Sequence, residues 1–301
     1  MNPHPLDKLA ARDKPPATRR AIETWIQQAE ASAGIGASRL GWMVAASIVI
    51  AALQRITQED AQPRFLLKGG AYLEFRLGIK ARATQDIDTL FRGDFHHFID
   101  KLDEVLAEPF AGITFRRTEP ETIQIPGRLV NPIRLNIVLS LRGRTWRKVI
   151  LEVAPDEGQA GSNIERFRFP SLAHFGLPTP ETIAGISVAY QVAQKLHACS
   201  APHAEDHPNY RVRDIVDLIL IKREYYSNLS SLDELKAACE DVYSSRNKLV
   251  SRLPARFWPP VLLDNPLWRS DYVAYAKEIE MELPLDDALN ELNNWIAEIA
   301  K

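Results

Sequence analysis

The stretch from residue 65 to residue 91 restricts the fold of this chain more than any other part of the sequence. A short apolar run at Phe65–Leu67 is followed by Gly69 and Gly70, a helical segment and a second apolar run at Asp86–Phe91. Buried strands are short and apolar, whereas glycine pairs mark turns. We therefore expect a strand, a glycine turn, a short helix and a second strand.

Two carboxylates in the second strand, Asp86 and Asp88, are the first candidates for chemistry. Side chains alternate along a strand, so positions i and i+2 lie on one face with their Cα atoms about 6.5–7 Å apart. Ile87 then points to the opposite, apolar face. Hard oxygen ligands suit Mg²⁺ or Mn²⁺, and Mg²⁺ is commonly bound by one or two carboxylates together with substrate phosphates. The alternative is a solvated acidic pair on an exposed strand.

The glycine turn adds a candidate anion site. Gly69 and Gly70 open a helix directly after a buried strand. Backbone N–H groups at a helix N-terminus attract anions such as a triphosphate. Only one short helix separates the turn from the acidic pair, so we expect the two to face each other. A plain tight turn is the alternative.

A third carboxylate, Glu152, lies in the apolar strand-like run from Lys148 to Val153. Buried strands rarely hold an acid without a partner or a metal. Three acids that hold two metal ions about 3.5–4 Å apart are suited to in-line displacement at phosphorus. The alternative is an ion pair between Glu152 and a neighbouring arginine of the same hairpin.

The remaining pattern predicts an α+β, bilobed chain. Helical periodicity covers Thr18–Ala33 and Ser38–Glu59, with Ser38 as the N-cap, and a hairpin with its turn at Gly143 follows the second strand. Beyond the linker Pro155–Asn163 the pattern is mostly helical. We expect a lobe with a mixed sheet over residues 1–158 and a mainly α-helical lobe over residues 159–301.

The sequence gives no sign of a membrane span or of secretion. The apolar run Leu40–Leu53 has 14 residues, fewer than the roughly 20 that span a bilayer, which predicts a buried helix. Cys199 and Cys239 are too few for a disulfide framework, and the first residues lack a signal core. We expect a reducing, cytoplasmic setting and no membrane partner.

The second lobe contributes one lysine and two acids at helical spacing. Lys195 lies among apolar residues in the helical run Ser187–Cys199. Asp214 and Asp217 follow Arg211 at the start of another helix, three positions apart and therefore on one face. An interhelical salt bridge from Lys195 to these acids is one interpretation, and a phosphate contact by Lys195 is the other.

The balance of charge restricts where a nucleic acid can bind. The chain has 37 Lys and Arg against 39 Asp and Glu, a formal net charge of −2, so basic residues must concentrate on one face. The stretch from Arg128 to Lys148 has six basic residues and no acid. Arg142, Arg144 and Arg147 are the candidates for an RNA path, and a solvated hairpin is the alternative.

Together these motifs resemble the AbiEii/AbiGii-type nucleotidyltransferase toxins, including the MenT group, which are the toxin halves of bacterial toxin–antitoxin pairs. That family carries a K-G-G-[ST] turn, an R-x-T-x-D-[IF]-D strand, a later acid on a strand, a K-L-x-A helix and an R-x-[KRH]-D-x-x-D-L helix. The matching positions are Lys68–Ala71, Arg82–Asp88, Glu152, Lys195–Ala198 and Arg211–Leu218. One residue departs from the pattern, because Ala71 stands where a hydroxyl residue is usual.

The resemblance implies a catalytic lobe similar to that of DNA polymerase β-like nucleotidyltransferases. It also implies transfer of a nucleoside monophosphate, often a pyrimidine nucleotide, from an NTP to the 3′ end of tRNA, which stops translation. By this resemblance Asp86, Asp88 and Glu152 hold Mg²⁺, with Glu152 as third ligand or base for the 3′-hydroxyl. Lys68 and Lys195 contact phosphates.

Further expectations from the resemblance concern the nucleotide, the partner and regulation. Gly69, Gly70, Arg211 and Asp214 belong to nucleotide binding, and Asp217 belongs to the catalytic set. A cognate antitoxin is the expected protein partner, and some members are silenced when it phosphorylates a hydroxyl at the place of Thr84. A Thr chosen for strand propensity is the alternative for Thr84.

Two other functions remain open on the sequence alone. The first is a catalytically silent regulator that binds RNA or DNA through the basic hairpin. The second is a nucleotidyltransferase whose acceptor is a protein or a small molecule, since acceptors are distinguished by surface shape rather than by motif.

Overall fold

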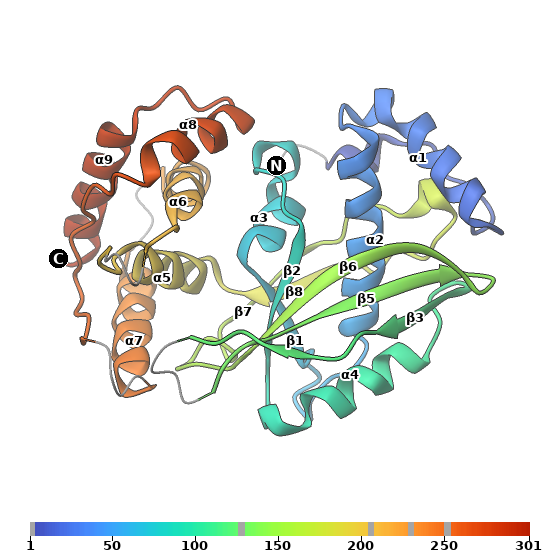
Figure 1. Cartoon of the computed structure of the whole chain (residues 1–301), viewed down its shortest axis with the longest axis horizontal. Coiled ribbons are helices and arrows are strands. Elements are labelled where there is room, and N and C mark those ends of the chain that lie inside the picture. Colours follow the sequence, from blue (N-terminus) through green and yellow to red (C-terminus); the bar gives the residue numbers. More distant parts are fainter. Residues whose placement is uncertain (1–3, 126–129, 204–207, 228–231, 250–253) are drawn as a thin grey trace. The chain divides into compact units, whose positions relative to one another are not determined.

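A computed structural model of the chain describes residues 4–125, 130–203, 208–227, 232–249 and 254–301 (Figure 1). The chain divides into two compact units. The first comprises Met1–Gln124, Asn131–Asp156 and Ile164–Gly185; the second comprises Ile125–Val130, Glu157–Asn163 and Ile186–Lys301. The chain thus has an α+β architecture, in which a mixed sheet is followed by C-terminal helices.

The first unit is built on the sheet. Its helices are α1 (Arg19–Ala33), α2 (Ala37–Leu53), α3 (Gly69–Leu77) and α4 (Phe98–Ala107). Its strands are β1 (Phe65–Lys68), β2 (Asp86–Phe91), β3 (Ile113–Arg117), β4 (Glu121–Thr122), β5 (Ile133–Leu141), β6 (Arg144–Pro155), β7 (Ile164–Arg168) and β8 (Thr182–Ile186). Within the described residues the strand order is β3-β5-β6-β2-β1-β8-β7, and β4 pairs with β5.

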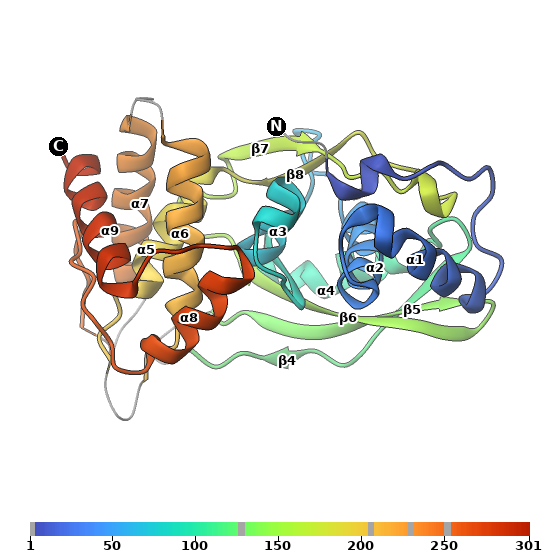
Figure 2. The ribbon, with the colours of Figure 1, turned by 90° about the horizontal axis from the view of Figure 1, so that it is seen from above.

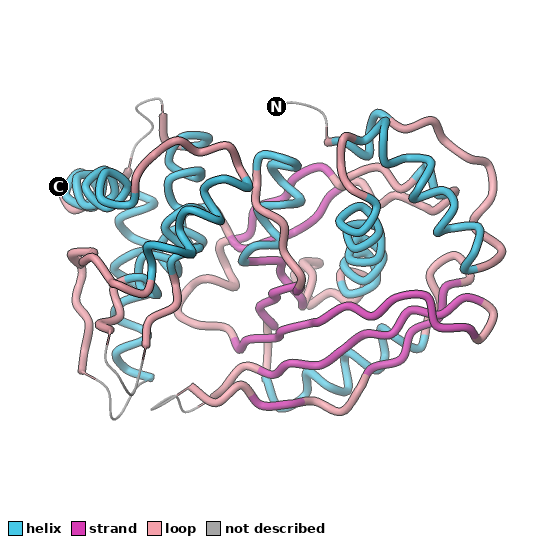
Figure 3. The backbone as a smooth tube through the Cα atoms, turned by 45° about the horizontal axis from the view of Figure 1, so that its top comes forward, coloured by secondary structure: helices cyan, strands magenta, loops and turns pink. Residues whose placement is uncertain are grey.

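The sheet is mixed because β2 has one parallel and one antiparallel neighbour. It runs parallel to β6 and antiparallel to β1, which places β2 between them. Strands β5 and β6 form the long hairpin that is drawn in magenta in Figure 3. The predicted hairpin and its turn at Gly143 are therefore present, with Gly143 at φ +74°.

Helices cover one face of the sheet. Thr89 of β2 and Leu67 of β1 line a small space together with Ile50 and Leu53 of α2. Phe91 of β2 contacts Phe98 of α4 on the same face, with ring centroids 6.3 Å apart. Since side chains alternate along β2, this face is the one opposite to Asp86 and Asp88.

Helix α2 is the buried helix that the apolar run predicts. Its residues from Met43 to Leu53 are at most 7% exposed, and α1 packs beside it (Figure 2). The helix starts at Ala37 after Gly36 and ends at Leu53, so the expected N-cap at Ser38 and the expected extension to Glu59 are wrong. Among the described helices none alone is long and apolar enough to cross a membrane; α1 and α2 meet that test only as a pair bent by 113°.

The sheet continues beyond residue 158. Strand β8 pairs in parallel with β1 at Leu67 and Gly185, and β7 follows it at the edge. The unit that contains the sheet therefore includes Ile164–Gly185, whereas the sequence pattern places these residues in the helical lobe. A Cβ at Gly185 would lie 2.7 Å from the carbonyl oxygen of Leu67, so only glycine allows this close strand approach.

The second unit is helical in its described part. Its helices are α5 (Val188–Cys199), α6 (Val212–Tyr225), α7 (Asp233–Leu249), α8 (Trp268–Glu278) and α9 (Leu285–Ile299). Helix α5 packs against α6 and α7, and α6 packs against α8 and α9. Ser187 caps α5, because its Oγ accepts a hydrogen bond from the N–H of Tyr190. Cys199 and Cys239 are both buried and free.

Candidate active site

A row of charged residues crosses four neighbouring strands at one level of the sheet. Lys68 on β1 is in register with Asp88 on β2. Asp88 is in register with Glu152 on β6, and Glu152 with Arg134 on β5. Residues in register on neighbouring strands project from the same face. The structure therefore brings Lys68, Asp88 and Glu152 to one face.

Asp86 lies on this same face, two residues before Asp88. Ile87 between them is fully buried on the helix-covered face, which is the alternation that the sequence predicts. Asp86 accepts a hydrogen bond from the hydroxyl of Thr84, with 2.9 Å between Oγ1 and Oδ1. The two aspartates are half-buried and supply hard oxygen donors from one strand face.

The glycine turn lies directly against the aspartates. Gly69 is the first residue of α3 and has φ +65°, the left-handed region that favours glycine. A Cβ on Gly69 would overlap the Asp88 carboxyl group, 2.8 Å from its Cγ and 3.0 Å from its Cβ. A Cβ on Gly70 would lie 3.0 Å from Oγ1 of Thr84. The N-terminal end of α3 and the acidic strand are therefore in contact, and a negative group here is stabilised by the helix dipole.

A buried carboxylate that the sequence analysis missed, Glu74 of α3, fixes the approach to β2. Its side chain is fully buried and accepts hydrogen bonds from Arg39 Nε at 2.6 Å and from the N–H of Thr84 at 3.0 Å. Burial raises the pKa of Glu74 above its ordinary value, and the charge and hydrogen bond of Arg39 oppose that rise. The available signal was weak: an acid between the apolar residues Leu73 and Phe75, in a helix that also carries Arg76.

Glu152 forms the ion pair that the sequence analysis gave as its alternative. Arg134 donates from Nε to Glu152 Oε1 at 2.8 Å, and its terminal amino group donates to the same oxygen. The hydrogen bond to Glu152, followed by the negative charges of Glu152, Asp86 and Asp88, raises the pKa of Arg134. Within the part of the chain that the structure describes, no three His, Cys, Asp or Glu side chains are grouped closely enough to hold a metal ion.

These contacts decide which residues fit a divalent cation. Asp86 and Asp88 fit by donor chemistry and by their shared face, and Mg²⁺ is commonly held by one or two carboxylates with the substrate's phosphates. Glu152 is in register with Asp88 but engaged by Arg134. The fit of the third acid therefore depends on whether Arg134 releases it.

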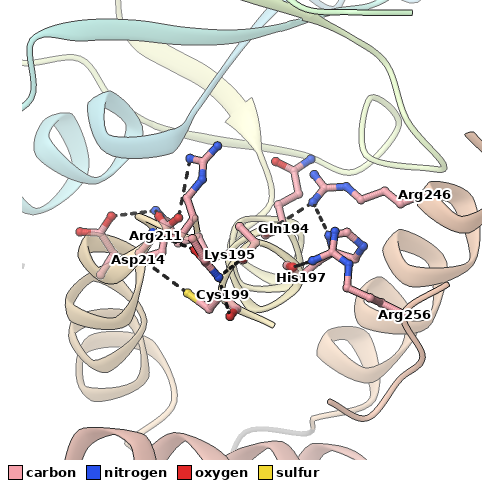
Figure 4. Close-up of polar contacts among 11 residues, drawn as sticks. Gln194, Lys195, His197, Cys199, Arg211, Asp214, Arg246 and Arg256 are labelled. Carbon is pink, nitrogen blue, oxygen red and sulfur yellow. Dashed lines mark hydrogen bonds and ion pairs between the residues drawn. The ribbon is translucent and has the colours of Figure 1, made fainter. Parts of the chain in front are cut away.

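The second unit contains a buried cluster around Lys195 (Figure 4). Nζ of Lys195 on α5 donates to Asp214 at 2.6 Å and to Asp217 at 2.7 Å, both on α6. The three side chains are 2–9% exposed. Arg211 is half-exposed, and its guanidinium lies 3.9 Å from Asp214. The interhelical salt bridge is thus present, and it joins α5 to α6 within this unit.

Cys199 lies beside this cluster. Its Sγ is 3.6 Å from the carbonyl oxygen of Arg211. Burial, followed by the charge of Asp214, raises the pKa of the Cys199 thiol well above its ordinary value. A buried thiol with a raised pKa is inert as a nucleophile.

The structure does not bring the three basic candidates of the hairpin together. Arg142 and Arg144 are exposed at the turn between β5 and β6. Arg147 lies on the helix-covered face, where its guanidinium is 3.3 Å from the carboxylate of Glu23 and packs over Gly41. Arg128, the first basic residue of the stretch, lies outside the described residues.

Comparison with known proteins gives a family match and similar solved structures. The family model described as "Nucleotidyl transferase AbiEii toxin, Type IV TA system" matches residues 51–293. Among solved structures, the chain is similar to the nucleotidyltransferase toxin MenT4 from Mycobacterium tuberculosis H37Rv. The two share 18% sequence identity, with a TM-score of 0.47, over 94% of this chain and 99% of that chain. No curated protein matches the chain.

Proposed function

The chain belongs to the AbiEii family of nucleotidyl transferase toxins of type IV toxin–antitoxin systems, and on that premise we propose that it transfers a nucleoside monophosphate from an NTP to the 3′ end of tRNA and so blocks translation. Membership of this family implies a nucleotidyltransferase activity, an NTP as substrate and a cognate antitoxin. The tRNA acceptor and a pyrimidine nucleotide as donor belong to our proposal, which takes them from the motif resemblance.

The observation that carries the proposal is the contact between Gly69 and Asp88. It places the N-terminal end of α3 against a strand face that bears two aspartates. A nucleotidyltransferase needs donors for the triphosphate next to carboxylates that hold a cation, and this contact supplies both groups from one short segment. Ala71 brings no hydroxyl to the turn, so binding here depends on backbone N–H groups and on Lys68.

Asp86 and Asp88 are the residues that would hold Mg²⁺ or Mn²⁺. When bound, such an ion neutralises phosphate charge and lowers the pKa of an attacking hydroxyl. Thr84 orients Asp86 through its hydroxyl, and Glu74 orients Thr84 through its N–H. Glu152 is the proposed third ligand or base for the 3′-hydroxyl.

In the second unit we propose two kinds of role: some residues contact the nucleotide, and others hold α5 and α6 in position. The resemblance assigns a phosphate contact to Lys195 and nucleotide binding to Arg211 and Asp214. The geometry within the unit supports a positioning role for Lys195 and Asp217, because both are buried in one ion cluster. Half-exposed Arg211 has a guanidinium accessible to a ligand.

The test is a label-transfer assay. The protein is incubated with each labelled NTP, Mg²⁺ and total tRNA, and the labelled product is identified. Asp86→Asn should abolish transfer with an unchanged circular dichroism spectrum, whereas Asp100→Asn, at an exposed position of α4, should retain it. Transfer at the wild-type rate by Asp86→Asn would contradict the assignment.

The same assay separates the other functions. Binding of tRNA without transfer of label to any acceptor would support a silent nucleic-acid-binding regulator. Label on a protein or a small molecule would keep the chemistry and change the acceptor.

We also propose Thr84 as the regulatory phosphorylation site. Its Oγ1 lies against Gly70 and is hydrogen-bonded to Asp86. A phosphate there would add a charge of about −1.5 to −2 beside Asp86 and repel an incoming triphosphate. Thr84 is 8% exposed, so a kinase must first open this turn. Intact-mass measurement after co-expression with the antitoxin tests this, and an unmodified Thr84 would refute it.

A further inference from the structure

The row of charged residues on the sheet continues past Glu152 to Arg134 and then to a second glutamate, Glu121. Arg134 on β5 stands between two glutamates at the same level: Glu152 on β6 and Glu121 on the short strand β4. In the structure Arg134 contacts Glu152 through two hydrogen bonds to one oxygen, Oε1. Glu121 is exposed at the other side of Arg134.

The two members of the ion pair differ in how firmly they are held. The side chain of Arg134 is 50% exposed, whereas that of Glu152 is 19% exposed. A half-exposed ion pair is weak in water, because solvent screens it and a long side chain must be ordered. Arg134 is therefore the member of the pair that is open to solvent, and a movement toward Glu121 would keep its charge beside a carboxylate.

The charge of Arg134 also acts on the aspartates. After the hydrogen bond and charge of Glu152, the negative charges of Asp86 and Asp88 also raise the pKa of the Arg134 guanidinium. Arg134 thus adds positive charge to a face that carries three carboxylates, on the side away from Lys68. A divalent cation on this face would supply the same neutralisation, so the cation and Arg134 would compete for Glu152.

We propose that Arg134 is a positioning residue that holds Glu152 as a displaceable counterion and releases it when a divalent cation is held by Asp86 and Asp88. This inference rests on the proposed function, since it concerns the cation of the same reaction. It predicts that Arg134 weakens the binding of the cation and that it does so through Glu152.

The experiment measures Mn²⁺ binding by the full chain without nucleotide or RNA, by calorimetric titration and by the electron paramagnetic resonance signal of free Mn²⁺. Arg134→Gln should tighten Mn²⁺ binding about fivefold, near the upper value for a half-exposed ion pair. In a Glu152→Gln background the same substitution should change the affinity less than about twofold, because the paired carboxylate is gone. Arg116→Gln, at an exposed position of β3 in the same sheet, is the control for removal of one positive charge.

Each outcome decides the inference. Equal tightening by Arg134→Gln in both backgrounds would show a general charge effect and would overturn it. Unchanged or weaker binding in Arg134→Gln, or no Mn²⁺ binding by any variant, would also overturn it. Failure of the proposed function is detected separately, because it would leave the wild-type chain without label transfer whatever its Mn²⁺ affinity.

Discussion

Replacing Gly69 by alanine tests the contact on which the proposed site depends, and the chain offers a matched control. Gly34, the residue that ends α1, has the same φ of +65° as Gly69. Nothing lies within 4 Å of a Cβ built on Gly34, whereas a Cβ on Gly69 would meet Asp88. The two variants share a positive φ, which disfavours alanine at both positions, and differ in the displaced carboxylate.

The expected magnitudes follow from this comparison. A left-handed backbone conformation costs an L-residue about 1–2 kcal/mol, so both variants should lose roughly that much stability. In Gly69→Ala the new Cβ also lies 3.0 Å from the Cβ of Asp88. Rotation of the Asp88 carboxylate alone does not relieve this contact, and the turn and β2 must move apart. A displacement of about 1 Å at a reacting group costs on the order of 100-fold in rate.

The assay compares kcat/KM for nucleotide incorporation and thermal unfolding in the two variants. We expect Gly69→Ala to unfold at a lower temperature than Gly34→Ala, because the turn and β2 must also move apart. At a temperature where both variants are folded, incorporation should be at least about 100-fold slower for Gly69→Ala alone. If Gly69→Ala incorporates nucleotide within about threefold of Gly34→Ala, the contact with Asp88 is not part of catalysis.

Three further predictions concern pH, RNA and the second unit. Burial lowers the pKa of His4 to about 4 from its ordinary value of 6.5, so the unfolded state binds more protons and the free energy of unfolding falls as the pH drops from 6.5 toward 4. Between pH 7.5 and 5.5 this free energy, measured by denaturant unfolding, should decrease by about 1.4 kcal/mol. The decrease should disappear in His4→Asn. The double variant Arg142→Gln with Arg144→Gln should reduce the salt dependence of tRNA binding by about one unit of slope for each phosphate that an arginine no longer neutralises, whereas Arg147→Gln should not. Lys195→Met should lower the stability of the chain by about 3–5 kcal/mol, measured by chemical denaturation.

The local part of the site was predictable because its signals are local. Alternation along β2 fixes Asp86 and Asp88 on one face and Ile87 on the other, whatever packs above them. A glycine pair after a strand predicts a backbone that other residues adopt at a cost, and Gly69 has such a conformation. The order of the segments between residues 65 and 91 follows from the same signals.

The contacts that were missed join residues far apart in the sequence. In the sequence, Glu74 cannot be distinguished from a solvent-exposed acid on a short helix. Its burial depends on the ion pair with Arg39, 35 positions earlier. Strand β8 is buried at every position after Thr182, so its sequence lacks the polar–apolar alternation that predicts a strand. For Glu152 both interpretations were available, and only the register of β5 and β6 identifies Arg134 as its partner.

Lys195 shows how stability and activity must be measured together to assign a role. Its amine is bound to Asp214 and Asp217, and all three side chains are at most 9% exposed. Lys195→Met therefore removes the buried cation that the two carboxylates share. The control Lys222→Met breaks the half-buried pair with Glu291 in the same unit and should cost at most about 1 kcal/mol. If Lys195 acts only through its ion cluster, Lys195→Met should be less stable than the wild type, and the folded variant should keep the wild-type KM for NTP. If Lys195 also contacts a phosphate of the NTP, Lys195→Met should have a higher KM for NTP at temperatures where the variant is fully folded. An unchanged KM at those temperatures would refute the phosphate contact.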